Sequence, residues 1–437
     1  MQLMEVKIEK LIYGGDGLAH HNGATVFVPF VIPGELVSAE SIEEKKKYLR
    51  ARLKQIVEPA PNRISAPCHH FGICGGCNYQ HISYESQLSA KAEILRETLR
   101  RIGRINWQGE ITTHASPPWG YRNCAQWKVR PFPGAAASSD TSETAKLAIG
   151  YFRANSTALC PIEDCAILSP ALLKAFHALR DGLASGMFPR QLREIEAFAA
   201  PTEGSDSKLL LTGTFAGFPP RLAEHAERIR ASIPGVESLL LYDPGHERME
   251  LLGPGFVEYR VGGVTYRVGH FSFFQVNDFL VQQLADAVVG GGDRGALALD
   301  LYAGVGLFSL PLADRFERVV AVESNPAAAR DLKTNVQDNG RIEVRATDVE
   351  QFLAKCKESP DLVVLDPPRA GLTPDVVEAL GHLAPPRINY VSCEPPTLAR
   401  DLALLEKCGY DISAIQLFDL FPQTFHMEAV VRLNRRS

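Results

Sequence analysis

The sequence carries the stretch Leu299-Asp-Leu-Tyr-Ala-Gly-Val-Gly306, in which an apolar strand that starts at about residue 296 runs into a Gly-x-Gly turn. After this turn we expect a helix over residues 307–316. Further apolar strands are expected at residues 319–323, 342–346, 361–365 and 388–392. This alternation of strands and helices predicts an open, Rossmann-like α/β sheet. Ligands of such sheets bind at the carboxyl ends of the strands, so the residues that follow each strand are candidates for function.

The turn that contains Gly304 and Gly306 has the features of a nucleoside-binding loop. The next strand ends in Glu323, about 20 residues beyond Gly304, at a distance where a carboxylate accepts hydrogen bonds from ribose hydroxyls. A dinucleotide-binding turn would have a third glycine, but position 309 is Ser309. The pattern therefore favours S-adenosylmethionine over NAD. Asp348, which follows the third strand, could reach the adenine ring.

A cysteine, Cys393, follows the strand at 388–392, and Asp366-Pro-Pro-Arg369 follows the strand before it. A thiol beside a cofactor loop is placed to attack a substrate. Thiolate addition at C6 of uracil makes C5 nucleophilic enough to take a methyl group, which a conjugated ring carbon otherwise resists. The Asp366 carboxylate could accept a ring N–H of the base. The alternatives are that Cys393 is a small buried residue at a strand end and that the proline loop only caps its strand.

A base that removes the C5 proton is expected in the segment 421–433. Glu428 interrupts an otherwise apolar strand there, so it is either an edge carboxylate that faces water or a buried functional group. His426 is the competing base, because it would point to the same side if the strand extends that far. Position alone leaves both open, with Glu428 ahead.

Three cysteines, Cys68, Cys74 and Cys77, crowd into ten residues of a glycine-rich segment. Three thiolates on such a loop can wrap one metal centre, because glycine lets the backbone bend tightly. The fourth ligand would be Cys160 or Cys165. Zinc and an iron–sulfur cluster both accept four cysteines, so the spacing leaves the metal open. The alternative is three unligated buried cysteines.

Residues 3–60 contain about five short strands separated by glycine turns, enough for a small closed barrel. Six lysines and arginines fall within residues 45–54. A basic hairpin on a small barrel is a common way to hold single-stranded RNA, although most charge runs are only solvated. Aromatic and basic residues interleave again between Trp119 and Arg130, where they could stack on and clamp unpaired bases, although some of them must be core.

The overall composition is that of an ordinary soluble protein, with 45% apolar and 22% charged residues in 437. Apolar runs are shorter than the ~18 residues of a membrane span, and the N-terminus lacks the apolar core of a signal peptide. We therefore expect a cytoplasmic protein without membrane contact, and a monomer. The net charge of −5 means that binding to nucleic acid would depend on local basic patches.

Together these motifs resemble those of the class-I, S-adenosylmethionine-dependent RNA 5-methyluridine methyltransferases. The resemblance runs nearly end to end, from a TRAM-like RNA-binding barrel through the cysteine loop to His426-x-Glu428. The other segments that carry it are Phe273-Phe-Gln-Val-Asn277, Asp300-Leu-Tyr-Ala-Gly-Val-Gly306, Asp366-Pro-Pro-Arg369 and Ser392-Cys393-x-Pro395.

The resemblance implies a role for each matching residue. Cys393 would be the nucleophile and Glu428 the proton acceptor. Contacts with S-adenosylmethionine would come from Gln275, Tyr302, Glu323 and Asp366. A [4Fe–4S] cluster would be held by Cys68, Cys74, Cys77 and Cys165, the last of which lies in the family's Cys-x-x-Leu-x-Pro context. Two positions depart from the pattern, since Leu307 and Asp348 stand where relatives often have asparagine.

Three domains are expected from this organisation. They are a TRAM-like, OB-like barrel over residues 1–60, a central α/β domain with the cluster and an RNA-contact surface over 61–270, and the methyltransferase domain over 271–437. A helix around 84–102 could pack on the methyltransferase domain. Residues 131–146 are of low complexity, and we expect a mobile hairpin insertion there.

The expected reaction is C5 methylation of a uridine in RNA. The barrel-plus-cluster architecture resembles the ribosomal branch, which favours 23S ribosomal RNA as substrate and leaves transfer RNA as the alternative. Cytosine-5 methylation is disfavoured by Arg369, because RNA cytosine-5 enzymes carry their nucleophile in that loop as Pro-Cys. A non-catalytic RNA-binding protein or chaperone is a third possibility, and intact Cys393 and Glu428 argue against it.

Overall fold

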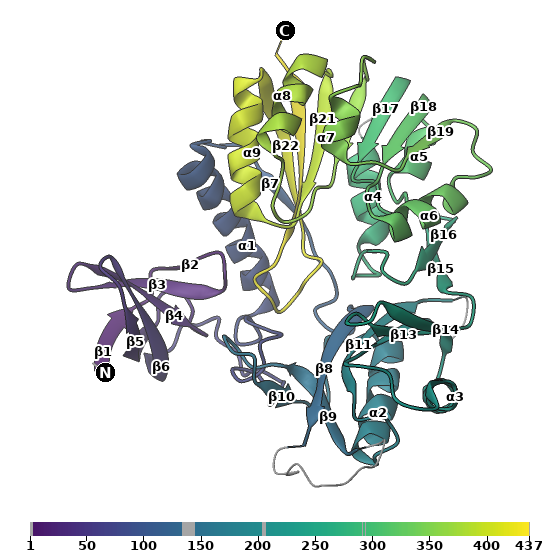
Figure 1. The fold of residues 1–437 in the computed structure, drawn as a ribbon. Coiled ribbons are helices and arrows are strands. Elements are labelled where there is room, and N and C mark those ends of the chain that lie inside the picture. Colours follow the sequence, from purple (N-terminus) through teal and green to yellow (C-terminus); the bar gives the residue numbers. More distant parts are fainter. Residues whose placement is uncertain (1–2, 133–144, 203–206, 291, 293, 437) are drawn as a thin grey trace.

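The computed structural model describes residues 3–132, 145–202, 207–290, 292 and 294–436. These residues form three large sheets, which lie at the left, the bottom and the top of Figure 1 in chain order. Residues 133–144, which make up most of the expected insertion at 131–146, lie outside the described residues. Within the described part, no helix is long and apolar enough to cross a membrane.

The N-terminal sheet has the strand order β1-β5-β6-β4-β3-β2. Its strands are β1 (Leu3–Lys7), β2 (Lys10–Leu11), β3 (Asp16–His21), β4 (Ala24–Pro29), β5 (Leu36–Glu44) and β6 (Tyr48–Glu58). Alternate residues such as Met4 and Val6 point into a small core of their own. Strand β1 ends at Lys7, and Ile8 exchanges backbone hydrogen bonds with Gly34 and Glu35. Closure of this sheet into a barrel stays a prediction.

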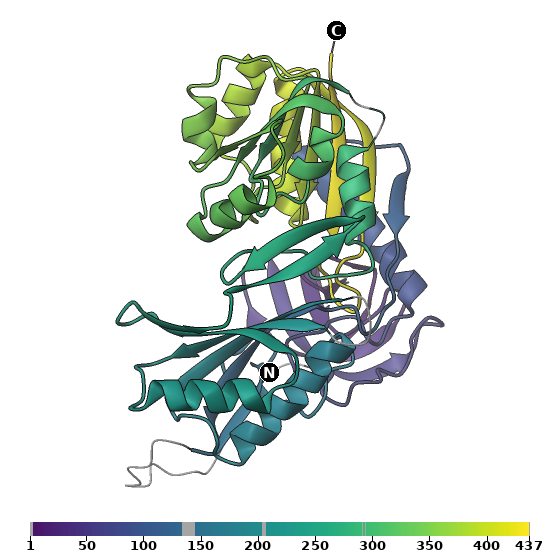
Figure 2. The same ribbon diagram turned by 90° about the vertical axis from the view of Figure 1, so that its right-hand side faces the viewer.

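The central sheet has the order β10-β9-β8-β11-β12-β13-β14. Its strands are β8 (Cys124–Pro131), β9 (Leu147–Phe152), β10 (Leu159–Pro161), β11 (Leu192–Ala200), β12 (Lys208–Phe215), β13 (Val236–Asp243) and β14 (Arg248–Leu252). Helices α2 (Pro170–Ala184) and α3 (Leu222–Ser232) cover one face of it, as Figure 2 shows. A hairpin of β15 (Phe256–Val261) and β16 (Val264–Gly269) lies between this sheet and the next.

The C-terminal sheet has the order β19-β18-β17-β20-β21-β23-β22-β7. Its strands are β7 (Ile111–His114), β17 (Gly295–Leu301), β18 (Phe316–Val322), β19 (Ile342–Arg345), β20 (Leu362–Leu365), β21 (Arg387–Ser392), β22 (Tyr410–Phe418) and β23 (Glu428–Arg435). Its helices are α4 (Val281–Val289), α5 (Ser309–Ala313), α6 (Pro326–Asn335), α7 (Val349–Leu353), α8 (Pro374–Leu383) and α9 (Pro395–Lys407). The five strands from β17 to β21 are parallel.

The strand order reverses between β17 and β20. From β17 the chain moves outward to β18 and β19, and then returns to the other side of β17 to form β20 and β21. A reversal of this kind opens a crevice at the carboxyl ends of the strands, which is where ligands bind in open α/β sheets. The fold therefore directs attention to the residues after β17, β18, β20 and β21.

Helix α1 (Tyr84–Thr98) continues into a π-helical turn over Leu99–Gly103, and together with β7 it lies with the C-terminal sheet. Strand β7 pairs with β22 at the sheet edge. Ile94 and Leu95 of α1 belong to the same hydrophobic core as β17, β20 and α9. The helix expected around 84–102 thus packs on the C-terminal sheet, as the sequence suggested. The proposed domain boundaries near residues 60 and 270 stay a prediction.

The helix predicted over 307–316 is shorter than expected. Helix α5 ends at Ala313, and Phe316 already opens β18, where its side chain is buried. The chain turns at Arg315, whose N–H donates to the Leu312 carbonyl. Helix α9 starts at Pro395, since proline suits the first helical position.

A buried ion pair joins the N-terminal sheet to the chain that follows it. The Glu35 carboxylate, which is fully buried, accepts hydrogen bonds from Ile32 N, Ala60 N and the Arg63 guanidinium. Arg63 also donates to the Phe30 carbonyl. Burial raises the pKa of Glu35, but the hydrogen bonds outweigh it and leave the pKa below its usual range.

Glu35→Gln should lower the free energy of unfolding of the N-terminal sheet by about 2–4 kcal/mol, because it leaves Arg63 and buried N–H groups without their charged acceptor. Urea unfolding followed by far-UV circular dichroism measures this. Glu40→Gln is the matched control, since Glu40 pairs with Lys54 at the surface and its loss should change stability by only ~0.5 kcal/mol. Equal effects of the two changes would contradict the prediction.

Candidate active site

Four predicted motifs meet at one edge of the C-terminal sheet. The glycine turn follows β17, Glu323 follows β18, Asp366 follows β20 and Cys393 follows β21. These strands are parallel neighbours, so their carboxyl ends lie at the same edge. The edge is the one at which the strand order reverses. Local strand-end motifs are thereby brought together by topology.

The turn after β17 adopts a backbone that few residues tolerate. Tyr302, Gly304 and Gly306 have φ of +65°, +56° and +96°. The φ of Gly306 is strained for a residue with a Cβ atom, which would also lie 2.7 Å from Leu332 Cδ1, so glycine is strongly favoured there. Tyr302 holds its left-handed conformation without that freedom, and strain of this kind tends to occur at functional sites.

The carboxylate of Glu323 closes this turn against β18. Gly304 N donates to Glu323 Oε2 at 2.8 Å, and Asn325 N donates to Glu323 Oε1 at 2.6 Å. The structure thus brings Glu323 and Gly304 into direct contact.

The other predicted cofactor residues lie around this turn. Asp348 is exposed and caps α7, accepting from Glu350 N at 2.8 Å. Burial raises the pKa of the Tyr302 hydroxyl to about 12 and the Asp348 carboxylate adds to this, which places the two side chains near each other. Gln275 is buried in the connection between β16 and α4, where its carbonyl accepts from Asn123. Their roles in cofactor binding stay predictions.

Buried carboxyl groups crowd the same edge. Asp300, the first residue of the glycine-turn motif, is fully buried and accepts from Ser309 Oγ at 2.5 Å. Burial raises the pKa of Asp300 to about 7, and the charge of Glu323 adds to it. Asp366 retains some solvent access, yet its burial raises its pKa to about 7, with contributions from Asp300 and Glu323.

The predicted catalytic residues form one electrostatic group with Arg369. Burial raises the pKa of Glu428 well above its usual value, Asp366 adds to the effect and Arg369 opposes it. Burial raises the pKa of the Cys393 thiol to about 12, with a further contribution from Glu428 and an opposing one from Arg369. The structure therefore places Cys393, Asp366 and Glu428 close together, from the ends of β20 and β21 and the start of β23.

His426, the competing base, lies outside the last strand. Strand β23 begins at Glu428, so the strand does not extend to residue 426. Burial, together with Arg369, Lys91 and Arg122, lowers the pKa of His426 to about 4. An imidazole of that pKa is a weak base, whereas a carboxylate of raised pKa is a stronger one than usual. The geometry thus favours Glu428 over His426.

The N-terminal sheet also reaches this site, which sequence reasoning did not foresee. The Tyr13 hydroxyl donates at 2.9 Å to Oε2 of Glu394, the residue that follows Cys393. The Tyr13 ring packs edge-on against Phe425 with centroids 5.3 Å apart. In the sequence Tyr13 only marks a glycine turn, and the contact spans 381 residues.

The four predicted metal ligands surround one small cavity. Cys68, Cys74, Cys77 and Cys165 line it together with Arg122 and Tyr151. Cys160, the other candidate, lies in the hydrophobic core of the central sheet. The glycine loop fits tightly, since a Cβ at position 75 would lie 3.0 Å from the Phe152 carbonyl. Among the described residues, however, no three His, Cys, Asp or Glu side chains are close enough to hold one metal ion.

Two aromatic residues of the stretch from 119 to 130 belong to the core and not to an RNA-contact surface. Tyr121 and Trp127 are fully buried, and Trp127 packs on Phe176 of α2. Trp127 points inward because inward and outward residues alternate along β8. Aromatic side chains line a different groove of about 620 Å³ between the N-terminal sheet, the cysteine loop and Phe425.

Asp300→Asn should stabilise the ligand-free protein above neutral pH. Because burial raises the pKa of Asp300 to about 7, the folded state keeps a proton between about pH 4 and pH 7 that the unfolded state loses. This group's contribution to stability therefore falls as pH rises through that window. We expect a gain of about 2 kcal/mol at pH 8 that shrinks toward pH 4. Melting curves against pH measure it, with exposed Asp338→Asn as control.

Neighbouring charges should set the reactivity of Cys393. Glu428→Gln removes a charge that raises the pKa of the thiol, so iodoacetamide should alkylate Cys393 about 3- to 10-fold faster at pH 9. Arg369→Gln should slow alkylation by a similar factor, because the thiol loses a cation that lowers its pKa. Mass spectrometry of the Cys393 peptide measures both rates. Changes in the same direction would contradict the electrostatic grouping.

Comparison with known proteins identifies the family. Residues 258–436 match the family model described as tRNA (uracil-5-)-methyltransferase, and residues 2–54 match the TRAM domain. The chain is 33% identical to the 23S rRNA (uracil(1939)-C(5))-methyltransferase RlmD of Klebsiella pneumoniae, covering 100% of this chain and 96% of that protein. It is 32% identical to an uncharacterized RNA methyltransferase of Aquifex aeolicus, over 98% of each chain.

A solved structure shares the whole architecture. The Pyrococcus abyssi tRNA (uracil-54, C5)-methyltransferase in complex with S-adenosyl-L-homocysteine aligns with a TM-score of 0.74 and 26% identity, covering 98% of this chain and 100% of that one. The resemblance drawn from the motifs is confirmed. The chain belongs to the family of S-adenosylmethionine-dependent RNA (uracil-5-)-methyltransferases and carries a TRAM domain in its N-terminal part.

Proposed function

We propose that this protein methylates C5 of a uridine in 23S ribosomal RNA through a covalent adduct with Cys393. The observation that carries this proposal is the meeting of Cys393, Asp366 and Glu428 at the edge where the strand order reverses. A nucleophile, a base and a cofactor loop are the parts that this chemistry needs.

Each catalytic residue has one task in the proposed reaction. The Cys393 thiolate adds to C6 of uracil, and the C5–C6 electron pair moves into an enolate whose C5 is nucleophilic. C5 then takes the methyl group that S-adenosylmethionine supplies on its sulfonium. Glu428 removes the proton from C5, and the released electron pair restores the double bond and expels the thiolate.

Asp366 and Arg369 support these steps. With its pKa near neutral, Asp366 can accept the ring N–H of an extruded uracil. The guanidinium of Arg369 lowers the pKa of both Cys393 and Glu428, which favours the thiolate that attacks and the carboxylate that removes the proton. Both residues come from the loop after β20.

We infer that S-adenosylmethionine binds across the turn after β17. Gly304 and Gly306 allow the close approach of the ligand, and Glu323 would hold the ribose hydroxyls. Tyr302, Asp348 and Asp366 would lie around the adenine and the methionine part, and Gln275 would contribute from the segment before α4. The contact of Glu323 with Gly304 supports this arrangement.

We further infer that Cys68, Cys74, Cys77 and Cys165 hold a [4Fe–4S] cluster. Four thiols that line one cavity are a suitable donor set, and the tight fit at Gly75 suits a loop that must bend around a ligand. Such a cluster would fix the backbone of the loop. The proposed role is structural, since the reaction above transfers no electrons.

The choice of 23S ribosomal RNA rests on relatives and not on the architecture. RlmD of Klebsiella pneumoniae is 33% identical to this chain, while the transfer-RNA enzyme of Pyrococcus abyssi is 26% identical and matches over its full length. The groove beside the active site, which Phe27, Phe30 and Phe152 line with Arg50 and Arg153, suits unpaired bases and phosphates. Stacking there would hold the RNA segment from which the uridine is extruded.

Methyl transfer tests the proposal directly. The purified protein should transfer label from S-adenosylmethionine to 5-methyluridine in 23S ribosomal RNA taken from a strain that lacks this gene. Cys393→Ala should abolish transfer, at least ~1,000-fold, because the attacking group is gone. Label in transfer RNA would show that the choice of 23S ribosomal RNA as substrate is wrong. RNA binding without any label would favour a non-catalytic RNA-binding protein.

A further inference from the structure

The connection between β22 and β23, residues 419–427, is held from outside the sheet to which it belongs. We call it the base loop, because it ends at Glu428. In Figure 1 it extends from the C-terminal sheet toward the central one. Four consecutive carbonyl groups of the base loop accept hydrogen bonds from other parts of the chain. Asn277 donates to Leu420 O at 3.2 Å, Lys91 to Phe421 O at 3.1 Å, Tyr121 to Pro422 O at 2.9 Å, and Asn78 N and Tyr79 N to Gln423 O at 2.9 Å.

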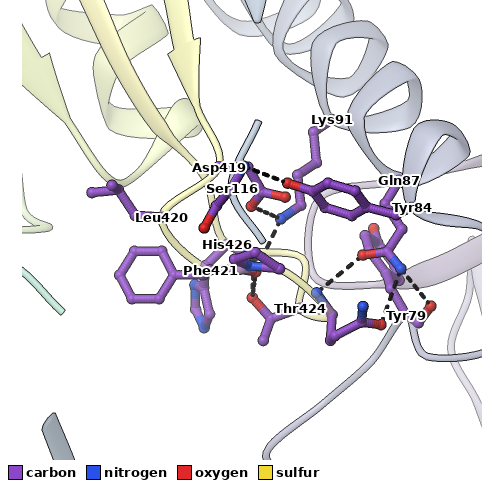
Figure 3. Close-up of polar contacts among 12 residues, drawn as sticks. Tyr79, Tyr84, Gln87, Lys91, Ser116, Asp419, Leu420, Phe421, Thr424 and His426 are labelled. Atoms are coloured by element: carbon purple, nitrogen blue, oxygen red, sulfur yellow. Dashed lines mark hydrogen bonds and ion pairs between the residues drawn. The ribbon is translucent and has the colours of Figure 1, made fainter. Parts of the chain in front are cut away.

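Lys91 also forms an ion pair with the base loop. Its ammonium donates to Asp419 Oδ1 at 2.6 Å as well as to Phe421 O, as Figure 3 shows. Both side chains of the ion pair are completely buried. Burial lowers the pKa of Lys91, and the Asp419 carboxylate partly offsets this. A buried ion pair is seldom more stable than apolar residues of the same size, so stability alone does not account for it.

Gln87, one turn before Lys91 on α1, clamps the middle of the base loop. Its side-chain amide donates to Gln423 Oε1 at 3.0 Å, and its oxygen accepts from Gln423 N at 3.0 Å. The same amide also donates to the carbonyls of Tyr79 and Ile82. Gln423 has φ of +68°, a left-handed backbone that costs energy in a residue other than glycine. The two-way clamp holds this residue in place.

Lys91 and Gln87 hold the base loop at two points between β22 and Glu428. Asp419 follows Phe418, which is the β-bridge partner of Glu428. Lys91 therefore fixes the loop where it leaves β22, and Gln87 fixes it five residues before Glu428. His426 N donates to Thr424 Oγ1, so the last turn of the loop is ordered as well.

We propose that Lys91 and Gln87 are positioning residues that hold Glu428 against the substrate through the base loop. The inference rests on the proposed role of Glu428 as the base. The competing explanation is that these polar contacts only fasten α1 to the C-terminal sheet.

The two explanations predict different kinetics. Thiolate addition and methyl transfer precede the step that uses Glu428, and removal of the C5 proton releases the RNA. A displaced Glu428 slows release without slowing the steps before it, since its charge raises the pKa of the attacking thiol, so methylated RNA that is covalently bound to Cys393 accumulates. In a protein that is merely less stable, the fraction of folded enzyme falls, so the observed rates of addition, methyl transfer and release fall by the same factor.

Lys91→Met and the double change Lys91→Met with Asp419→Asn test this. We expect release to slow by ~10-fold or more, against the 10²–10⁴-fold that a general base contributes, while methyl transfer in a single turnover falls less than ~3-fold. Adduct is measured as labelled RNA that stays with the protein in sodium dodecyl sulfate. The double change removes the unpaired charge, so its melting temperature should exceed that of Lys91→Met while release remains slow.

Leu95→Ala is the matched control. Leu95 lies on the same helix, is fully buried, and packs in the core of the C-terminal sheet. Its change should lower the melting temperature without raising the fraction of adduct. Gln87→Met, which breaks the clamp without leaving a buried charge, provides a second test if Lys91→Met does not fold.

Glu428→Gln calibrates the assay. If it accumulates adduct and Lys91→Met and Gln87→Met do so no more than Leu95→Ala, the positioning inference is wrong and the proposed function stands. If neither the wild-type protein nor Glu428→Gln yields methylated or covalently bound RNA, the proposed function is wrong and the inference falls with it.

Discussion

The active site depends on a repulsion that the fold cannot avoid. Parallel strands end at one edge, so the residues that follow β17, β18, β20 and β21 have to lie close together. The carboxylates at that edge are Asp300 near the end of β17, Glu323 and Asp366 after β18 and β20, and Glu428 at the start of β23. Partial burial makes the mutual repulsion of carboxylates stronger than it would be in water. A site built in this way is more stable with protons or ligands bound than empty, and it provides bases that are stronger than usual.

Much of the C-terminal sheet could be predicted because its signals are local. An apolar run gives a strand, and the residue that follows it gives a position at the edge, so Glu323, Asp366 and Cys393 follow from reading one short segment at a time. Errors arose where tertiary contacts override local pattern. Helix α5, predicted to reach residue 316, stops at Ala313 because Phe316 is needed in β18.

Residues that act across the chain could not be predicted in the same way. Tyr13 touches Glu394 over 381 residues and Lys91 pairs with Asp419 over 328. The only sequence signal is that Lys91 and Gln87 share the face of α1 that carries Ile94 and Leu95. Polar side chains on an apolar helix face need a buried hydrogen-bond partner, because burial without one costs free energy. The sequence pattern does not identify that partner. The partner's identity comes from the way in which α1 packs on the sheet.

The pairing of β7 with β22 has a consequence for synthesis of the chain. Helix α1 and strand β7 are made about 300 residues before β22, so the ribosome releases them long before their partners exist. An edge strand and a helix with Lys91 on its inner face must wait while the central sheet and most of the C-terminal sheet are made. Such segments are prone to associate with other chains. The emerging polypeptide is therefore open to such association from the time that β7 is made until β22 is made, and a chaperone that shields α1 and β7 would raise the yield of folded protein.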